Sequence, residues 1–153
     1  MIIRYSKVRK GVATPTRANP SDAGLDVYFC PEKNTEDKCR LQPGDSRILS
    51  TGLKFEVPHG YMLEVKNRSG MAAKRSLVVG ACVIDSGYEG EVFINLHNVG
   101  SHTQHVKAGT KIAQLVLTPV VHFRPQETAT EALYNEYPMT ISDRGDGALG
   151  STG

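Results

Sequence analysis

Apolar and polar residues alternate one by one along several short stretches of this 153-residue chain. The clearest stretches are Leu53–Val57, Tyr61–Lys66 and Val92–Leu96. Side chains of a β-strand point alternately to its two faces, so a period of two buries one face and leaves the other in water. Turn-forming clusters separate the stretches, among them Gln42–Asp45 and Asn98–Ser101. The pattern predicts an all-β domain, most simply a jelly-roll-like or Greek-key sandwich.

Helical spacing is rare, and the chain length fits one domain. Ser69–Ser76 is predicted to form a short helix, and Thr128–Asn135 is a weaker helix candidate. The charged, turn-rich segment Lys33–Lys38 is expected to be a solvated loop. We expect a single β domain over residues 1–143 and a glycine-rich C-terminal arm over residues 144–153.

The charges and the cysteines exclude several classes of function. Eighteen Lys and Arg against sixteen Asp and Glu give a net charge of +2, without a long basic run, so no nucleic-acid or membrane partner is expected. Cys30, Cys39 and Cys82 are odd in number and form no C-x-x-C motif, which argues against a disulfide framework and a zinc site. These features, and the lack of an apolar run near about 18 residues, predict a cytoplasmic protein, or one inside a host cell if the gene is viral.

The stretch Val83–Val92, VIDSGYEGEV, is the first candidate for catalysis. An aspartate such as Asp85 is ionised at neutral pH and can accept a proton from a bound water, which favours hydrolysis over acid catalysis. Gly87 and Gly90 permit a sharp turn, and Tyr88 offers a flat ring to a ligand. The simpler interpretation of the same residues is an ordinary β-hairpin with a surface aspartate and a half-buried tyrosine.

The C-terminal residues DRGDGALGSTG are rich in glycine. A frayed tail is the ordinary interpretation, preceded by a long surface connection over Arg124–Asp143. However, Arg144, Ser151 and Thr152 are residue types that bind phosphate, and the glycines let backbone N–H groups approach it closely. A tail that becomes ordered on a phosphate ligand is the alternative.

Five segments, taken in order, resemble the five motifs of the trimeric dUTPases, which hydrolyse dUTP to dUMP and pyrophosphate. They are SDAGLDV (Ser21–Val27), NRSGMA (Asn67–Ala72), GACVIDSGYEGEV (Gly80–Val92), AGTKIAQLVL (Ala108–Leu117) and RGDGALGSTG (Arg144–Gly153). The resemblance covers nearly the whole chain. It implies a homotrimer with three shared active sites, in which the C-terminal arm closes over the nucleotide of a neighbouring subunit.

The resemblance assigns the recognition of base and sugar to Val83–Val92 and the residues just before it. Asp85 corresponds to the general base that activates a water for in-line attack on the α-phosphorus. Tyr88 corresponds to the aromatic residue that packs on the deoxyribose and leaves no room for a 2′-hydroxyl. The hairpin that leads to the general base Asp85 is expected to bind uracil through its backbone groups. Its residues are Gly80, Ala81, Cys82, Val83 and Ile84.

The other motifs imply phosphate and metal contacts. Arg68, Ser69 and Gly70 match the phosphate-binding segment at a helix start. Asp26 matches the acid that supports Mg²⁺ through metal-bound water, because Mg²⁺ dehydrates reluctantly. Further nucleotide contacts are implied for Gln114, Arg144, Leu149, Gly150 and Ser151. Without the resemblance, Gln114 is simply an outward polar residue of an apolar strand.

Leu149 departs from the family pattern, which has an aromatic residue that stacks on uracil. Leucine can cover a base but cannot stack on it, and base–aromatic stacking is worth about 1–3 kcal/mol. We predict a raised KM or weaker ordering of the arm, with the chemical step kept. Affinity of Leu149→Phe for dUTP tests this prediction; no gain would mean that the leucine is already optimal or that the arm closes differently.

Ala148, just before Leu149, also replaces a usual glycine of the last motif. Two smaller departures lie elsewhere: Asn67 stands where proline is common, and Gly87 stands where many members have aspartate. We expect neither Asn67 nor Gly87 to touch the reacting groups.

Two other functions remain as alternatives. A dCTP deaminase, or a bifunctional deaminase and diphosphatase, shares the expected fold, but Gly80–Ile84 offers no carboxylic acid for the cytosine amino group. A regulatory protein that uses nucleotide occupancy to control a partner would also keep the fold.

Overall fold

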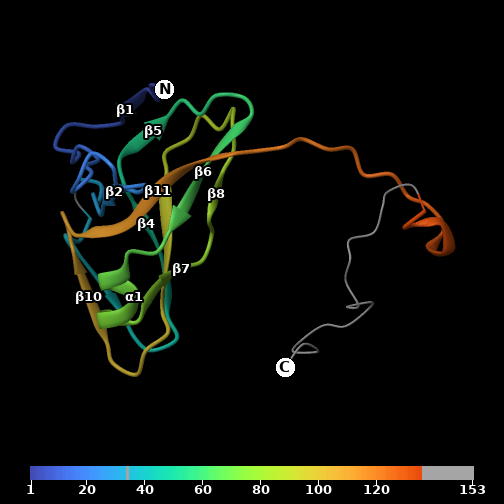
Figure 1. Cartoon of the computed structure of the whole chain (residues 1–153). Helices are drawn as coiled ribbons and strands as arrows, with labels where there is room; N and C mark the ends of the chain where they lie inside the picture. The colour runs from blue at the N-terminus through green and yellow to red at the C-terminus, as the bar shows by residue number, and fades with distance from the viewer. Residues whose placement is uncertain (34, 136–153) are drawn as a thin grey trace. The chain divides into compact units, whose positions relative to one another are not determined.

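The computed structural model describes residues 1–33 and 35–135 (Figure 1). Its elements are β1 (Tyr5–Lys7), β2 (Leu25–Tyr28), β3 (Lys38–Leu41), β4 (Ser46–Ser50), β5 (Leu53–Phe55), β6 (Tyr61–Lys66), α1 (Ser69–Arg75), β7 (Leu77–Val79), β8 (Val83–Ile84), β9 (Phe93–Asn98), β10 (Gln104–Lys107), β11 (Lys111–Pro119) and the 3-10 turn η1 (Thr130–Ala132). The predicted all-β, jelly-roll-like class is confirmed.

Antiparallel pairs make up every sheet of the described residues. One sheet has the order β2-β11-β6-β8 and a second the order β4-β9-β7, while β1 pairs with β5 and β10 pairs with β3. In Figure 1 the long strand β11 runs beside β6 through the middle of the first sheet. Strands from distant parts of the sequence are therefore neighbours, and this brings separate motifs together.

The alternating pattern buries the side chains that it predicted. In β9, Ile94 and Leu96 are fully buried whereas Phe93 is exposed. In β6, Leu63 and Val65 are buried and pair across the sheet with Leu117 and Leu115. These residues belong to one apolar cluster with members from both larger sheets.

The first helix prediction is confirmed and the second is wrong. α1 ends at Arg75 and is capped by Ser76, whose φ of 52° is left-handed and whose N–H closes the last turn onto the carbonyls of Ala72 and Met71. In Thr128–Asn135 only η1 forms, and it buries none of its residues. A short segment without a buried apolar face lacks the packing that stabilises most helices, so propensity alone was insufficient.

The stretch Val83–Val92 is not a hairpin. β8 pairs with β6, whereas β9 pairs with β4 and β7, so the loop between them crosses from one sheet to the other. The turn Gly80–Cys82 likewise joins β7 to β8 in different sheets. Alternation reports which face of a strand is buried but not which strand lies beside it, so the predicted hairpins were wrong.

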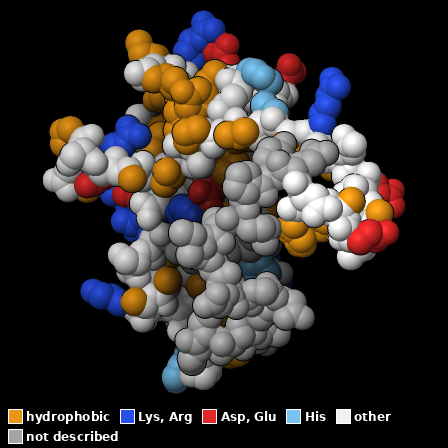
Figure 2. Space-filling model, turned by 45° about the vertical axis from the view of Figure 1, so that its right-hand side comes forward, with side chains coloured by type: hydrophobic (Ala, Val, Ile, Leu, Met, Phe, Trp, Pro, Cys, Tyr) orange, Lys and Arg blue, Asp and Glu red, His pale blue; other side chains and the backbone are white. Residues whose placement is uncertain are grey.

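The chain divides into two compact units, Met1–Val121 and His122–Gly153. The predicted boundary at residue 143 lies outside the described residues. Within the described ranges, no helix is long and apolar enough to cross a membrane. Figure 2 shows Lys and Arg side chains scattered over one face of the described surface instead of gathered in a single patch.

Candidate active site

A polar hollow of about 330 Å³ lies where β2, β11 and the start of α1 meet. Four residues predicted to bind phosphate or metal line it, namely Asp26, Arg68, Ser69 and Gln114. The rest of its wall is formed by Ala18, Asp22, Ala23 and Gly24. Residues from three sequence motifs thus share one cavity.

Strand register explains how these residues meet. Gln114 of β11 lies directly opposite Asp26 of β2 and, on its other side, opposite Lys66 of β6. Residues directly opposite each other in an antiparallel pair point to the same face. Arg68 follows β6 by two residues and is the N-cap of α1, in an extended conformation that lets the chain turn over this row.

Asp26 is held by two cations. Its Oδ1 accepts from Nε of Arg68 at 2.7 Å, and its Oδ2 lies 2.9 Å from Nζ of Lys111. Asp26 is only 8% exposed. Its hydrogen bond and its negative charge raise the pKa of Lys111, whose ammonium also lies 5.8 Å from the ring centre of Tyr28. Asp26, Arg68 and Lys111 together carry a net charge of +1, which the carboxylate of Asp22 on the same wall offsets, so anion binding here relies on directed donors such as Arg68.

Gln114 is fixed from two sides. Its Nε2 donates to the carbonyl of Asn67 at 2.8 Å, and a Cβ on Gly24 would overlap its amide group. Asn67 also accepts, through Oδ1, from the N–H of Val79 at 2.7 Å. Asn67 thus joins Gln114 to the end of β7, and whether it touches the reacting groups stays a prediction.

A second hollow, of about 190 Å³, contains Asp85. Its lining is Val83, Ile84, Asp85, Tyr88, Glu91, Val92 and Phe93. The N–H of Tyr88 bonds to the carbonyl of Asp85 at 3.3 Å, and Gly87 has a φ of 85°, which suits the third position of a type II turn. Asp85 is an exposed residue, so water can reach it.

Tyr88 keeps one end of its ring anchored and much of the ring accessible. Its hydroxyl donates to the carbonyl of Glu91 at 2.9 Å, while 45% of the residue is exposed. A Cβ on Gly90 would overlap the phenol ring, so glycine is required for this close approach. The ring can therefore present a face to a ligand without turning freely.

The turn before Asp85 is held by its backbone. The N–H of Gly80 donates to the carbonyl of Asn95 at 2.9 Å, and the N–H of Val65 donates to the carbonyl of Cys82 at 2.8 Å. Ala81 and Cys82 are exposed at the tip. The predicted uracil-reading segment is thus an accessible backbone turn held at both ends.

Comparison with known proteins decides the family. The family model for dUTPase matches residues 10–153. The chain belongs to the dUTPase family. A deoxyuridine 5′-triphosphate nucleotidohydrolase of Clostridium acetobutylicum is 35% identical over 99% of this chain and 96% of its own length. The protein of that name from Anaplasma marginale is 34% identical over 94% of this chain and 90% of its own length.

Solved structures agree on the fold. The dUTPase of Staphylococcus bacteriophage 80alpha, solved as a mutant with dUpNHpp, superposes with a TM-score of 0.81 at 23% identity, over 99% of this chain and 98% of the other. A dUTPase from phage phi11 of S. aureus, studied for its structural Mg(II) ion, has a TM-score of 0.74 at 22% identity, over 84% and 97% of the two chains. This chain therefore has the same fold as the solved dUTPases.

Part of the predicted dUTPase site lies outside the described residues. Those residues are Arg144, Leu149, Gly150 and Ser151. Among the described ones, Gly70 lies in the first turn of α1 but does not line the polar hollow. The polar hollow and the Asp85 hollow share no lining residue. The described site of this dUTPase therefore has two separate parts.

The residues present fit a magnesium ion that arrives with phosphate ligands. Over residues 1–33 and 35–135, no three His, Cys, Asp or Glu side chains come together as a metal cage. Mg²⁺ in nucleotide sites keeps several waters and uses one or two carboxylates beside the phosphates. Asp26 is a suitable carboxylate, although Arg68 and Lys111 already contact its two oxygens.

Three further positions contact residues of the candidate site or line its hollows, and the sequence alone did not indicate this. Lys111 was hidden inside an apolar motif, and only the pairing of β11 with β2 brings it near Asp26. Asn67 was judged by its neighbours in sequence instead of by its contact with Gln114. Glu91 lines the same hollow as Asp85. The family resemblance gave this glutamate no role, although a charged residue next to buried Val92 was a signal that it has a partner.

Proposed function

We propose that this protein hydrolyses dUTP to dUMP and pyrophosphate. The observation that carries the proposal is the polar hollow in which Asp26, Arg68, Ser69 and Gln114 meet, with Arg68 and Lys111 both contacting the Asp26 carboxylate. The relatives that are 34–35% identical over nearly the whole chain bear the name of that activity.

The polar hollow would hold the triphosphate. Arg68 can offer its terminal amino groups to phosphate oxygens while its Nε contacts Asp26. Ser69 and Gln114 line the same wall and supply neutral donors. Lys111 would keep the Asp26 carboxylate neutralised when Arg68 turns toward the phosphates.

The Asp85 hollow would hold the sugar and the attacking water. Asp85 takes a proton from the water as the water oxygen bonds to the α-phosphorus in line. The bond from this phosphorus to the bridging oxygen breaks, and the electron pair leaves with pyrophosphate. Tyr88 would pack its exposed face on the deoxyribose and exclude a 2′-hydroxyl, while the turn Gly80–Ile84 reads uracil through its backbone.

Magnesium is the cofactor of this proposal. Bound to the triphosphate, it would supply charge neutralisation at the phosphate oxygens. Asp26 would hold it through water on the wall of the polar hollow.

We further propose a homotrimer with shared active sites. The two described hollows have no residue in common, which suits sites that are completed by contacts between subunits. Exposed Ile48, Phe93 and Val83 offer apolar surface for such contacts. In a cell, hydrolysis of dUTP would keep uracil out of DNA and supply dUMP for dTMP synthesis, and we propose a cytoplasmic or host-cell location.

We expect a panel of nucleotides to show one preferred substrate. With Mg²⁺ present, pyrophosphate release should be fast from dUTP and at least about 100-fold slower from dCTP, dTTP and UTP, because a site built on shape and hydrogen bonds rejects analogues by this factor or more. Chelation of Mg²⁺ should lower the rate with dUTP.

The same panel separates the competing activities. Ammonia release from dCTP would identify a deaminase and overturn the proposal. Equal rates with dUTP and UTP would contradict the role of Tyr88 in sugar selection. The oligomeric state is checked by light scattering on the full chain, where a monomer would contradict the trimer.

A further inference from the structure

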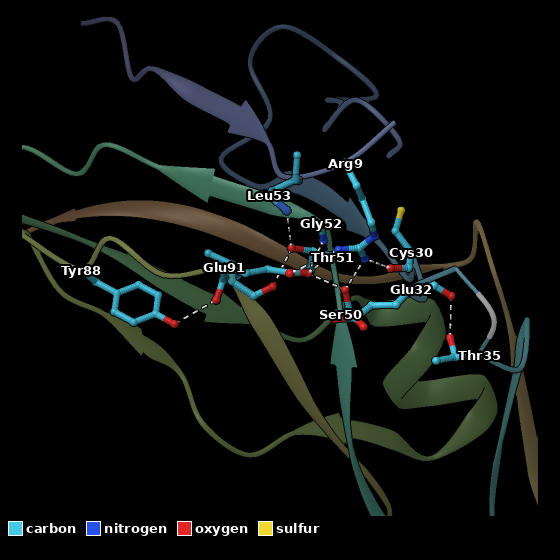
Figure 3. A network of polar contacts seen from close by, with 11 residues as sticks. Arg9, Cys30, Glu32, Thr35, Ser50, Thr51, Gly52, Leu53, Tyr88 and Glu91 are labelled. Carbon is cyan, nitrogen blue, oxygen red and sulfur yellow. Dashed lines mark hydrogen bonds and ion pairs between the residues drawn. The ribbon is translucent and has the colours of Figure 1, made fainter. Parts of the chain in front are cut away.

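Glu91 is the centre of a part-buried polar network that the proposed chemistry does not use (Figure 3). Its carboxylate accepts from the N–H of Gly52 at 2.7 Å and from the hydroxyl of Ser50. Nη1 of Arg9 lies 3.3 Å from Oε2 of Glu91. The side chains of Arg9 and Glu91 are only 19% and 13% exposed.

Arg9 ties the network to other parts of the fold. Its Nη2 donates to the hydroxyl of Ser50 at 2.5 Å and to the carbonyl of Cys30. Cys30 follows β2, Ser50 ends β4, and Gly52 precedes β5. The carboxylate of Glu91 is thus fixed against elements that lie far from it in the sequence.

Tyr88 is anchored to Glu91 through the backbone carbonyl of Glu91, so fixing Glu91 also restrains Tyr88. Figure 3 shows the Tyr88 hydroxyl directed at the Glu91 carbonyl, and this hydrogen bond is 2.9 Å long. The next residue, Val92, is buried, and its N–H bonds to the carbonyl of Leu53 at 2.8 Å. The loop from Asp85 to Glu89, which contains Tyr88, is in contrast largely exposed.

An ion pair of this kind contributes more to position than to stability. Desolvation of two charges offsets most of their attraction, so buried pairs are weak stabilisers compared with apolar residues of similar volume. The loop that carries Asp85 and Tyr88 has few buried side chains of its own, so its shape depends on polar anchors.

We propose that Glu91, held by Arg9, is a positioning residue that sets the place of the Tyr88 ring and thereby the discrimination between deoxyribose and ribose nucleotides. The proposal rests on the proposed dUTP hydrolysis. Glu91 does not touch substrate in this account, and it acts through its own backbone carbonyl and the Tyr88 hydroxyl.

The test uses Glu91→Gln in the full chain. Glutamine keeps an acceptor for Gly52 and Ser50 but loses the charge that binds Arg9. We expect the ratio of kcat/KM for dUTP to that for UTP to fall about tenfold, within the range that pocket shape alone supplies. Tyr88→Phe, which removes the hydroxyl that bonds to Glu91, should lower the ratio similarly, and the double variant should not lower it further.

Asp45→Asn is the matched control. Arg47 and Asp45 also form an arginine–carboxylate pair, at 3.6 Å, but their side chains are 53% and 33% exposed and neither lines the hollows beside Tyr88. This change should leave the dUTP to UTP ratio unaltered. Arg9→Lys, which keeps a charge beside Glu91, should retain more discrimination than Glu91→Ala.

Amide hydrogen exchange supplies a readout that does not depend on activity. In Glu91→Gln the amides of residues 85–90 should exchange faster than in the wild type, while those of the buried strand β9 stay protected. Unchanged exchange in this loop, or an unchanged dUTP to UTP ratio in a folded variant, would overturn the positioning role. Absence of dUTP hydrolysis in the wild type would refute the proposed function, and the exchange experiment would still decide whether Glu91 positions the loop.

Discussion

Asp85→Asn should lower kcat for dUTP by about 10²- to 10⁴-fold, the usual contribution of a positioned general base. Asparagine has almost the same shape as aspartate but cannot accept the proton of the attacking water. The carboxylate is exposed, so the melting temperature should change little. Nucleotide binding should survive, because the phosphate contacts lie in the other hollow. Pre-steady-state pyrophosphate release and equilibrium binding of dUTP measure the two effects separately.

Glu89→Gln is the control for Asp85→Asn. Glu89 is an exposed carboxylate in the same loop, four residues further along the chain. Its neutralisation changes the charge of the loop by the same amount without touching the proposed base, so kcat should stay within about twofold, as is usual for a surface change away from the chemistry. If Asp85→Asn turned over dUTP near the wild-type rate, another group would have to accept the proton.

Sequence patterns predicted the strands and the buried faces because these depend on local alternation. Ile94 and Leu96 are buried as expected, since each strand has only two faces to choose between. The pairing of strands was not predictable in this way. Val83–Val92 carries turn residues between two apolar runs, yet β8 and β9 join different sheets. Long-range packing, which leaves no local signature, decides that choice.

For the candidate site, too, the identity of the residues could be predicted but their mutual contacts could not. The resemblance to the dUTPase motifs indicated Asp26, Arg68, Ser69 and Gln114, and the structure brings all four to one hollow. Their mutual contacts could not be predicted, because they depend on β11 lying between β2 and β6. Lys111 became visible as a partner of Asp26 only through that register. A role for a motif residue can be proposed from the family resemblance, whereas the charged groups that surround the residue become known only from the fold.

Arg68→Ala should lower kcat/KM for dUTP by about ten- to a hundredfold, since a hydrogen bond to a charged group is worth about 1.5–3 kcal/mol. The loss should appear mainly in KM if Arg68 contacts the phosphates equally before and during the reaction. Asp26 would keep Lys111 at 2.9 Å, so its carboxylate would not be left buried and unpaired, and the melting temperature should fall only slightly.

Arg75→Ala separates phosphate binding from support of the helix. Arg75 ends α1, and its Nε and Nη2 donate to Gln104 Oε1 and to the carbonyl of His105 at 3.1 and 2.7 Å, outside the polar hollow. If Arg68 acted only by stabilising α1, Arg75→Ala would raise KM for dUTP as much as Arg68→Ala does. We expect instead that Arg75→Ala lowers the melting temperature with KM nearly unchanged. Arg68→Lys should recover part of the lost affinity, because lysine restores the charge but not the planar fork of donors that fits a phosphate.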